Sequence, residues 1–279
     1  MSIRLGVGAI FKNESHVMEE WINHYLREGA DRFFLIDNGS SPEYDSTKII
    51  EKYKEVCVLY RDPEPYKQTE HYNKYIMRHI SEVDWMIIVD LDEFMYSRGP
   101  YDTIKDYLIT IPREISQIKT IWKIFSSNNF IFQPPLVVPY FVNIGRYEIQ
   151  FKSVFRTSDI SYINIHQSIM KRGHNACAIK VHSNKCTERN LFCDCQNYCK
   201  DGKELNENLK KIDQYLLHLN HYQIQSWEFF RNVKMSRGDC YSASFNHIRN
   251  EKHYFNSVDK NNIIDEELKI KHYSNSLRL

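Results

Sequence analysis

A chain of 279 residues with 42% hydrophobic and 14% aromatic residues can bury a full core, which argues against a disordered protein. Its 37 basic and 36 acidic residues nearly cancel to a net charge of +1, which argues against a polycation that binds nucleic acid. No run reaches the roughly 18–20 apolar residues of a membrane-spanning helix, and residues 1–11 lack the apolar region of a signal peptide. We therefore expect a soluble globular protein.

Up to residue 98, predicted strands alternate with predicted helices, and the connections are short. The predicted strands are residues 3–11, 32–36, 56–60 and 85–89. The predicted helices are residues 14–27, 45–53 and 66–80. Because strands that alternate with helices form a parallel sheet covered on both faces, this order predicts an α/β fold.

The pattern is looser in the rest of the chain. We expect a helix, a strand, a group of short strands and a last helix at residues 101–110, 118–125, 162–181 and 226–237. Residues 246–279 are polar and predict a peripheral C-terminal segment. The chain is thus expected to be one domain, with residues 1–98 as a nucleotide-binding half and residues 99–245 as a half that shapes the substrate site.

The strongest chemical signal is an apolar run, Trp85 to Val89, that ends in the carboxylates of Asp90, Asp92 and Glu93. Ligands of open α/β sheets bind at the carboxyl ends of the strands. On a continuing strand Asp90 and Asp92 would share a face, and two such oxygen ligands suit Mg²⁺ or Mn²⁺ carrying a diphosphate. This D-x-D pattern therefore predicts a metal site, with an acidic turn that pairs with arginine as the alternative.

Two other nucleotide-binding patterns do not fit. The P-loop needs G-x-x-x-x-G-K-[ST], which none of the nine glycines supplies. The dinucleotide fingerprint fails as well, because Phe11 stands where the third glycine should follow Gly6 and Gly8.

Polar residues follow the first two predicted strands, at the same edge of the sheet. After the first strand, Asn13 is expected to cap a helix and Glu14 to lie in its first turn, which leaves room for a binding role. After the second strand, Asp37 and Asn38 either form a turn or hydrogen-bond a base or ribose. The sequence leaves both interpretations open.

The predicted helix 226–237 carries Lys234 and Arg237 three residues apart and is preceded by His221. The two cations can face one way and clamp a diphosphate, or they can remain solvated, and position alone favours solvation.

Five cysteines cluster within residues 177–199, near His174 and His182. Their spacing is not that of a C-x-x-C pair, so free or locally paired thiols are favoured over structural zinc.

Five segments, in order along the chain, resemble glycosyltransferase family 92 and the related family 2-like transferases of bacteria and large viruses. They are Lys12-Asn13-Glu14 with Glu20-Trp21, Gly29 through the D-N-x-S loop at Asp37, Gln68 with the run from Trp85 to Phe94, Trp122 to Phe130, and His221-Tyr222 to Gly238. Ser126 departs from the family pattern, which usually has glycine there.

The resemblance implies a GT-A fold, with a Rossmann-like, mainly parallel sheet and a smaller acceptor-side subregion. It also implies a metal-dependent, inverting transfer of a hexose from a nucleotide-sugar, commonly a UDP-sugar such as UDP-galactose, to a glycan or other hydroxyl acceptor. The N-terminal anchor usual in animal members is not seen, and Asn, Lys, Ile and Tyr are abundant as in AT-rich genomes. We therefore expect a cytoplasmic protein or one of a viral factory.

The resemblance also suggests roles for individual residues. The expected ligands of Mn²⁺ or Mg²⁺ are Asp92, His221 and Asp90, which would hold metal, ribose or both. The residues expected to bind the nucleotide-sugar are Lys12, Asn13, Glu14, Asp37, Asn38, Arg61, Gln68, Asp90, Lys234 and Arg237. An inverting transfer needs a base, for which the candidates are Glu93, Glu228 and Asp239. Glu93 alternatively holds the metal-binding loop in place.

Two rival functions remain. The first is a non-catalytic GT-A-like protein that binds sugar nucleotides or glycans, and the intact Asp90, Asp92 and His221 argue against it. The second is a sugar-nucleotide pyrophosphorylase, which needs a glycine-rich basic loop after the first strand. Residues 11–14 contain no glycine and therefore disfavour it.

Overall fold

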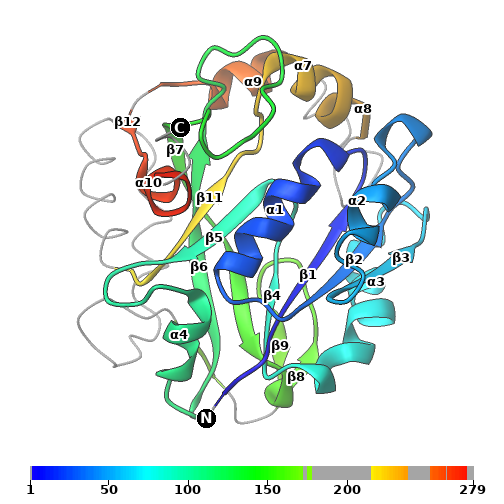
Figure 1. Ribbon diagram of the computed structural model, residues 1–279, viewed down its shortest axis with the longest axis vertical. Helices are drawn as coiled ribbons and strands as arrows, with labels where there is room; N and C mark the ends of the chain where they lie inside the picture. The colour runs from blue at the N-terminus through cyan, green and yellow to red at the C-terminus, as the bar shows by residue number, and fades with distance from the viewer. Residues whose placement is uncertain (1, 172–174, 178–214, 238–251, 262, 275–279) are drawn as a thin grey trace.

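The computed structural model describes residues 2–171, 175–177, 215–237, 252–261 and 263–274, and a mixed β-sheet forms its centre (Figure 1). The strands follow the spatial order β3-β2-β1-β4-β7-β6-β11-β5. Their bounds are β1 Leu5–Phe11, β2 Arg32–Asp37, β3 Cys57–Arg61, β4 Trp85–Ile88, β5 Glu93–Ser97, β6 Ile115–Phe125, β7 Asn143–Arg156 and β11 Leu217–His221. Two short strands, β10 (Asn175–Cys177) and β12 (Ile263–Ile264), pair with β6 and β7, while β8 (Ile160–Tyr162) pairs with β9 (Ile169–Met170) in a separate small sheet.

Helices connect and cover these strands. The α-helices are α1 Ser15–Arg27, α2 Thr47–Glu51, α3 Gln68–Tyr75, α4 Ile104–Ile109, α7 Trp227–Phe229, α8 Met235–Arg237, α9 Lys252–Val258 and α10 Glu267–Tyr273. The 3₁₀ turns are η1 Pro42–Tyr44, η2 Ile76–Glu82 and η3 Thr157–Asp159, and η4 Phe230–Lys234 is a π-helical turn between α7 and α8. The helix predicted for residues 66–80 is therefore split into α3 and η2.

The alternating first part of the chain confirms the predicted α/β fold. Strand β1 is parallel to β2 and β4, and β2 is parallel to β3. Buried Trp21 of α1 packs in the core on one face of the sheet, and buried Tyr72 of α3 packs in the core on the other. Helices thus cover both faces, and the carboxyl ends of the parallel strands meet at one edge.

The second part of the chain extends the same sheet with antiparallel strands. Strand β7 pairs with β4 on one side and β6 on the other, and β11 pairs with β5. Neither β5 nor β7 was predicted. In β7 the polar Lys152 and Ser153 are both buried, so the sequence lacks the apolar alternation typical of a strand.

The segment 246–279, expected to be peripheral, contributes to the core where the structure describes it. Val258 and Leu268 are buried, and β12 pairs with β7. The carboxylate of Asp265 contacts buried Lys123 of β6 at 2.6 Å. These described residues are therefore an integral layer of the domain.

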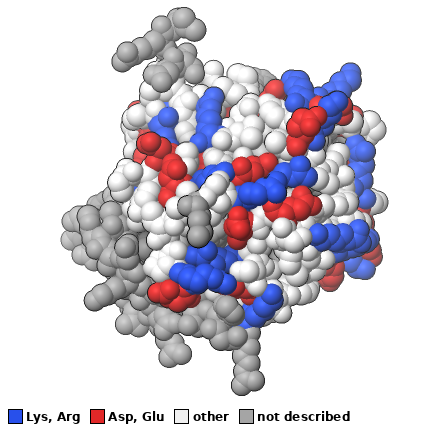
Figure 2. All heavy atoms as spheres, turned by 60° about the horizontal axis from the view of Figure 1, so that its bottom comes forward, with Lys and Arg blue, Asp and Glu red and all other residues white. Residues whose placement is uncertain are grey.

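Among the described residues we find no membrane-spanning helix, and the face in Figure 2 shows no large patch of one charge. No helix among the described residues is long and apolar enough to cross a membrane. Figure 2 shows Lys and Arg interspersed with Asp and Glu on the face that it brings forward. The cysteines at positions 186–199 lie outside the described residues, so the expectation for their thiols stays a prediction.

Candidate functional site

The D-x-D pattern lies in a tight turn rather than on a strand. Strand β4 ends at Ile88, and the Glu93 carboxylate accepts a hydrogen bond from the Asp90 N–H at 2.8 Å. The indole Nε1 of Trp21 donates to the carbonyl oxygens of Asp90 and Glu93, each at 3.1 Å. The prediction that the two aspartates share one face of a continuing strand is therefore wrong, because the turn sends them to different partners.

Asp90 faces a buried lysine that sequence reasoning missed. Its Oδ2 lies 2.9 Å from the Nζ of Lys152, and its Oδ1 accepts from the Gln68 amide at 3.3 Å. Burial by itself would raise the pKa of Asp90, but the Lys152 ammonium outweighs that effect and the pKa is lowered. Asp90 is thus held as a carboxylate at the sheet edge.

Glu93 lies behind this turn. Its side chain is fully buried, and its Oε2 is 3.4 Å from the Lys152 Nζ. Burial raises the pKa of Glu93 well above its ordinary value, against the opposing effect of the lysine. The geometry matches the alternative expectation that Glu93 holds the turn in place.

Asp92 is the meeting point of three segments that are far apart in the sequence. Its Oδ2 contacts the Nζ of Lys234, which also lies 3.0 Å from the Glu14 carboxylate. Its Oδ1 is 3.4 Å from the Nε2 of His221, and its backbone oxygen accepts from the Tyr222 N–H at 2.8 Å. The C-terminal half thus closes onto the acidic turn through β11 and the π-helical turn η4.

His221 is buried against an aromatic ring. It ends β11, and its ring lies 4.5 Å from that of Trp122 on β6, centroid to centroid. Its second ring nitrogen, Nδ1, makes no hydrogen bond to any residue that the structure describes. The imidazole therefore presents Nε2 to Asp92 from a fixed orientation.

A hollow of about 600 Å³ opens beside the ends of β2 and β3. It is lined by Asp37, Gly39, Ser40, Ser41, Pro42, Asp45, Thr47, Arg61 and Pro63. Arg61 is held at its rim by a hydrogen bond from its guanidinium to the Thr47 hydroxyl at 2.6 Å. The walls of the hollow combine hydroxyls, carboxylates and a guanidinium with two prolines and a glycine, so they offer a polar ligand both hydrogen-bonding groups and apolar contact.

The loop after β1 joins this hollow to the acidic turn. The Asn13 side chain accepts from the Ser41 N–H, and the Asn13 N–H donates to the Ser40 hydroxyl, both at 2.9 Å. The next residue, Glu14, contacts Lys234. The expectation that Asn13 caps the helix is wrong, because Glu14 is the residue that precedes α1. The side-chain oxygen of Asn13 accepts from Ser41 instead. A positive φ of 60° at Asn13 makes this bend possible.

The loop after β2 forms a turn, which is one of the two interpretations that its sequence allows. The Asp37 carboxylate accepts from the Ser40 N–H, three residues further on, at 2.8 Å. The Asn38 amide donates to the carbonyl oxygens of Asp62 and Glu64 at 2.7 and 2.9 Å. These bonds order the wall of the hollow. A hydrogen bond from Asp37 or Asn38 to a base or ribose stays a prediction.

The remaining predicted residues are more scattered. Lys12 directly follows β1 and is half-buried. The Glu228 carboxylate accepts from the Gln133 N–H at 2.9 Å. The side chain of Arg237 and the whole of Asp239 lie outside the described residues. The sequence does contain one signal for Lys152, which was not predicted. A lysine flanked by apolar residues such as Phe151 and Val154 is unusual unless it is paired.

Loops at the ends of parallel strands, joined to a charged turn at the same edge, are the arrangement of α/β proteins that bind nucleotides. The chain belongs to glycosyltransferase family 92, since the model of that family matches residues 7–278. It is 23% identical over 249 residues to a glycosyltransferase family 92 protein of Oryza sativa subsp. japonica. That match covers 86% of this chain and 36% of the rice protein, so this chain spans about a third of its relative's length.

Solved structures of lower similarity were also found. Staphylococcus aureus TarS, residues 1–349 in complex with UDP, aligns with a TM-score of 0.36 and 17% identity over 56% of this chain and 47% of that one. HddC from Yersinia pseudotuberculosis aligns with a TM-score of 0.31 and 10% identity over 60% and 84% of the two chains.

Proposed function

We propose that this protein is a metal-dependent, inverting glycosyltransferase that moves a hexose from a nucleotide-sugar, a UDP-sugar by its family resemblance, to a hydroxyl acceptor such as a glycan. One observation carries the proposal: a polar hollow is linked through Asn13 and Glu14 to the charged turn of Asp90 and Asp92. In this proposal a nucleoside would occupy the hollow, and its diphosphate would extend toward the turn. Family membership supports the reaction type.

The residues at the turn fit a divalent cation. Neighbouring ligands of an octahedral ion bound at about 2.1 Å lie about 3 Å apart. The Oδ1 of Asp92 and the Nε2 of His221 are 3.4 Å apart, and Lys234 contacts the other oxygen of Asp92. Asp92 and His221 would therefore hold Mn²⁺ or Mg²⁺. The Asp90 carboxylate is directed to Lys152 and Gln68 instead, so its expected part in the metal site stays a prediction. The ion supplies Lewis-acid neutralisation of the diphosphate charge.

The chain's own residues would prepare the reacting groups. In an inverting transfer the acceptor oxygen forms the new bond to the anomeric carbon while the bond to the diphosphate breaks, and the hydroxyl proton passes to a base. Of the three candidate carboxylates, Glu93 is fully buried behind the turn and suits a positioning role. We therefore favour Glu228 or Asp239 as the base. Lys234 would balance the negative charge of Glu14 and Asp92 around the diphosphate.

The test is release of the free nucleotide (UDP, GDP or CMP) from a panel of UDP-, GDP- and CMP-linked sugars, with and without Mn²⁺. Wild-type protein is compared with Asp92→Asn, which keeps the shape of the side chain and removes its charge. The expected result is metal-dependent turnover of one donor class that the variant loses by about 100-fold or more. Equal activity of the variant in Mn²⁺ would refute the metal assignment. Binding of a sugar nucleotide or a glycan without turnover of any donor would favour the non-catalytic alternative.

A further inference from the structure

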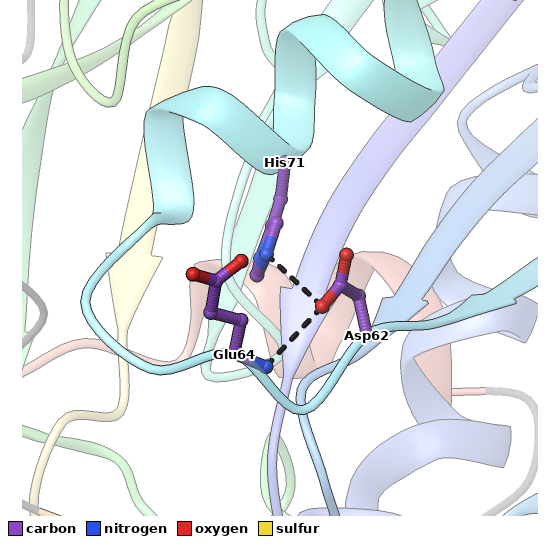
Figure 3. A group of neighbouring side chains, drawn as sticks. All are labelled: Asp62, Glu64 and His71. Carbon is purple, nitrogen blue, oxygen red and sulfur yellow. Dashed lines mark hydrogen bonds and ion pairs between the residues drawn. The ribbon is translucent and has the colours of Figure 1, made fainter.

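Outside the D-x-D turn, a second group of metal-ligating side chains lies where β3 leads into α3. Asp62 and Glu64 come from the loop after β3, and His71 comes from α3 (Figure 3). One ligand atom from each residue can be chosen so that all lie within 4.8 Å of one another. Figure 3 shows the imidazole of His71 pointing down from the helix toward the two acidic residues. Two separate segments thus direct three donors to one point.

His71 is the part of this group that calls for a ligand. Its side chain is only 2% exposed, and neither ring nitrogen makes a hydrogen bond within the described part of the chain. The nearest partner is the Oδ1 of Asp62, 3.5 Å from its Nε2, which is longer than a hydrogen bond. A neutral imidazole has a lone pair on one ring nitrogen that can bind a metal ion. A buried polar ring of this kind is normally satisfied.

The carboxylates keep oxygens for the same point. The Oδ2 of Asp62 is used by Lys74 Nζ and the Tyr75 hydroxyl, both at 2.8 Å, while its Oδ1 faces His71 and accepts the Glu64 N–H at 3.2 Å. The Glu64 carboxylate forms an ion pair with Lys67, whose side chain is 47% exposed. An exposed ion pair is weak, so the Glu64 carboxylate is able to turn toward a cation.

We propose that Asp62, Glu64 and His71 bind one zinc ion. One imidazole and two carboxylates provide three ligands of the type zinc uses, and solvent completes the tetrahedron. Magnesium and calcium prefer six or more oxygen ligands, which this site does not offer among its described residues. Lys67 and Lys74 offset the charge of the two carboxylates, so the affinity depends on the imidazole nitrogen rather than on excess negative charge.

Zinc at this position would fix one wall of the nucleotide hollow. Pro63, between the two acidic ligands, lines the hollow, and the Asn38 amide already holds the carbonyl groups of Asp62 and Glu64. The ligand His71 lies one helical turn after Gln68, which contacts Asp90. The ion would thus tie the hollow to the start of α3 without taking part in the reaction.

The test is calorimetric titration of Zn²⁺ into the full chain, first stripped with a chelator. Wild type is compared with Glu64→Gln, a change at an exposed side chain that preserves its shape, and with His71→Asn. The matched control is Glu70→Gln, which removes an exposed carboxylate of α3 that is not in the group. Zinc bound by the cysteines or at the D-x-D turn is common to all four proteins.

The expected result is one Zn²⁺ equivalent that wild type and Glu70→Gln bind and that Glu64→Gln and His71→Asn bind at least about 10-fold more weakly. Zinc should also raise the melting temperature of wild type more than that of Glu64→Gln. If His71→Asn does not fold, Glu64→Gln decides the outcome alone. Equal titrations of wild type and Glu64→Gln, or an equal loss in Glu70→Gln, would overturn the proposal. Both readouts are independent of sugar transfer.

Discussion

Replacing Lys152 by Met tests the electrostatic design of the D-x-D turn. The substitution keeps most of the length of a fully buried side chain and leaves Asp90 and Glu93 without their shared cation. Removing one partner of a buried ion pair costs about 3–5 kcal/mol. Because the Asp90 side chain is 30% exposed to water and Glu93 already has a raised pKa, we expect the lower end, about 3 kcal/mol. For a domain of this size that loss corresponds to a drop of about 6–12 °C in melting temperature.

The pH dependence of the Lys152→Met effect identifies its cause. In wild type the pKa of Asp90 is lowered, so its stabilising contribution is present above its ordinary pKa of about 3.9 and is lost as pH falls through the folded value. Without the lysine, protons bind both carboxyls at higher pH and relieve the repulsion. Urea unfolding should therefore show a larger loss at about pH 8 than at about pH 5.5.

The control for that experiment is Lys54→Met, which breaks an exposed pair with Glu51. It should cost no more than about 0.5 kcal/mol at either pH. A loss in Lys152→Met below about 1 kcal/mol, or one that does not change with pH, would show that the lysine contributes packing rather than charge.

Three further predictions concern the same site. Burial raises the pKa of Glu93, so wild-type stability should fall as pH rises above about 4.3. Glu93→Gln has no group to titrate there, so its urea midpoints should not show this decline, and its amide oxygen can still accept the Asp90 N–H and keep the turn. His221→Ala should weaken Mn²⁺ binding by about 10–100-fold in calorimetry, and an altered acceptor KM with unchanged metal affinity would contradict its role as a ligand. Lys234→Met should tighten Mn²⁺ binding, by up to about 10-fold, because the charge around Asp92 becomes more negative by one, and weaker binding would contradict that reasoning.

The first half of the fold was predictable because its signals are local. Each strand from β1 to β4 is a short apolar run, and the first intervening helix, α1, carries a buried stripe that includes Val17, Trp21 and Tyr25. The predicted bounds differ from the observed ones by a few residues, at positions such as Ile88 where a strand yields to a turn. Such ends depend on hydrogen bonds to distant residues, here those of Trp21, which no local pattern contains.

The second half was harder to predict because its strands are specified by long-range pairing. Strand β5 begins at Glu93, inside what reads as an acidic loop, and it exists because β11 pairs with it from more than a hundred residues away. The acidic residues after β4 and the loops after β1 and β2 lie at the sheet edge, as predicted, and His221 reaches them from the second half of the chain. Their partners were not, since the pairing of Asp90 with Lys152 is a property of the β4–β7 ladder.

The arrangement of charges explains why the two halves depend on each other. Asp90 and Asp92 leave β4 only two residues apart, yet a different lysine faces each, Lys152 from β7 and Lys234 from the turn before α8. Lys234 also holds Glu14, so one ammonium bridges the loop after β1 and the loop after β4. A carboxylate cluster built by the first half alone would repel itself. The second half supplies the opposing charges together with His221, and the arrangement of Asp92 and His221 that we propose to bind a cation therefore needs both halves of the chain.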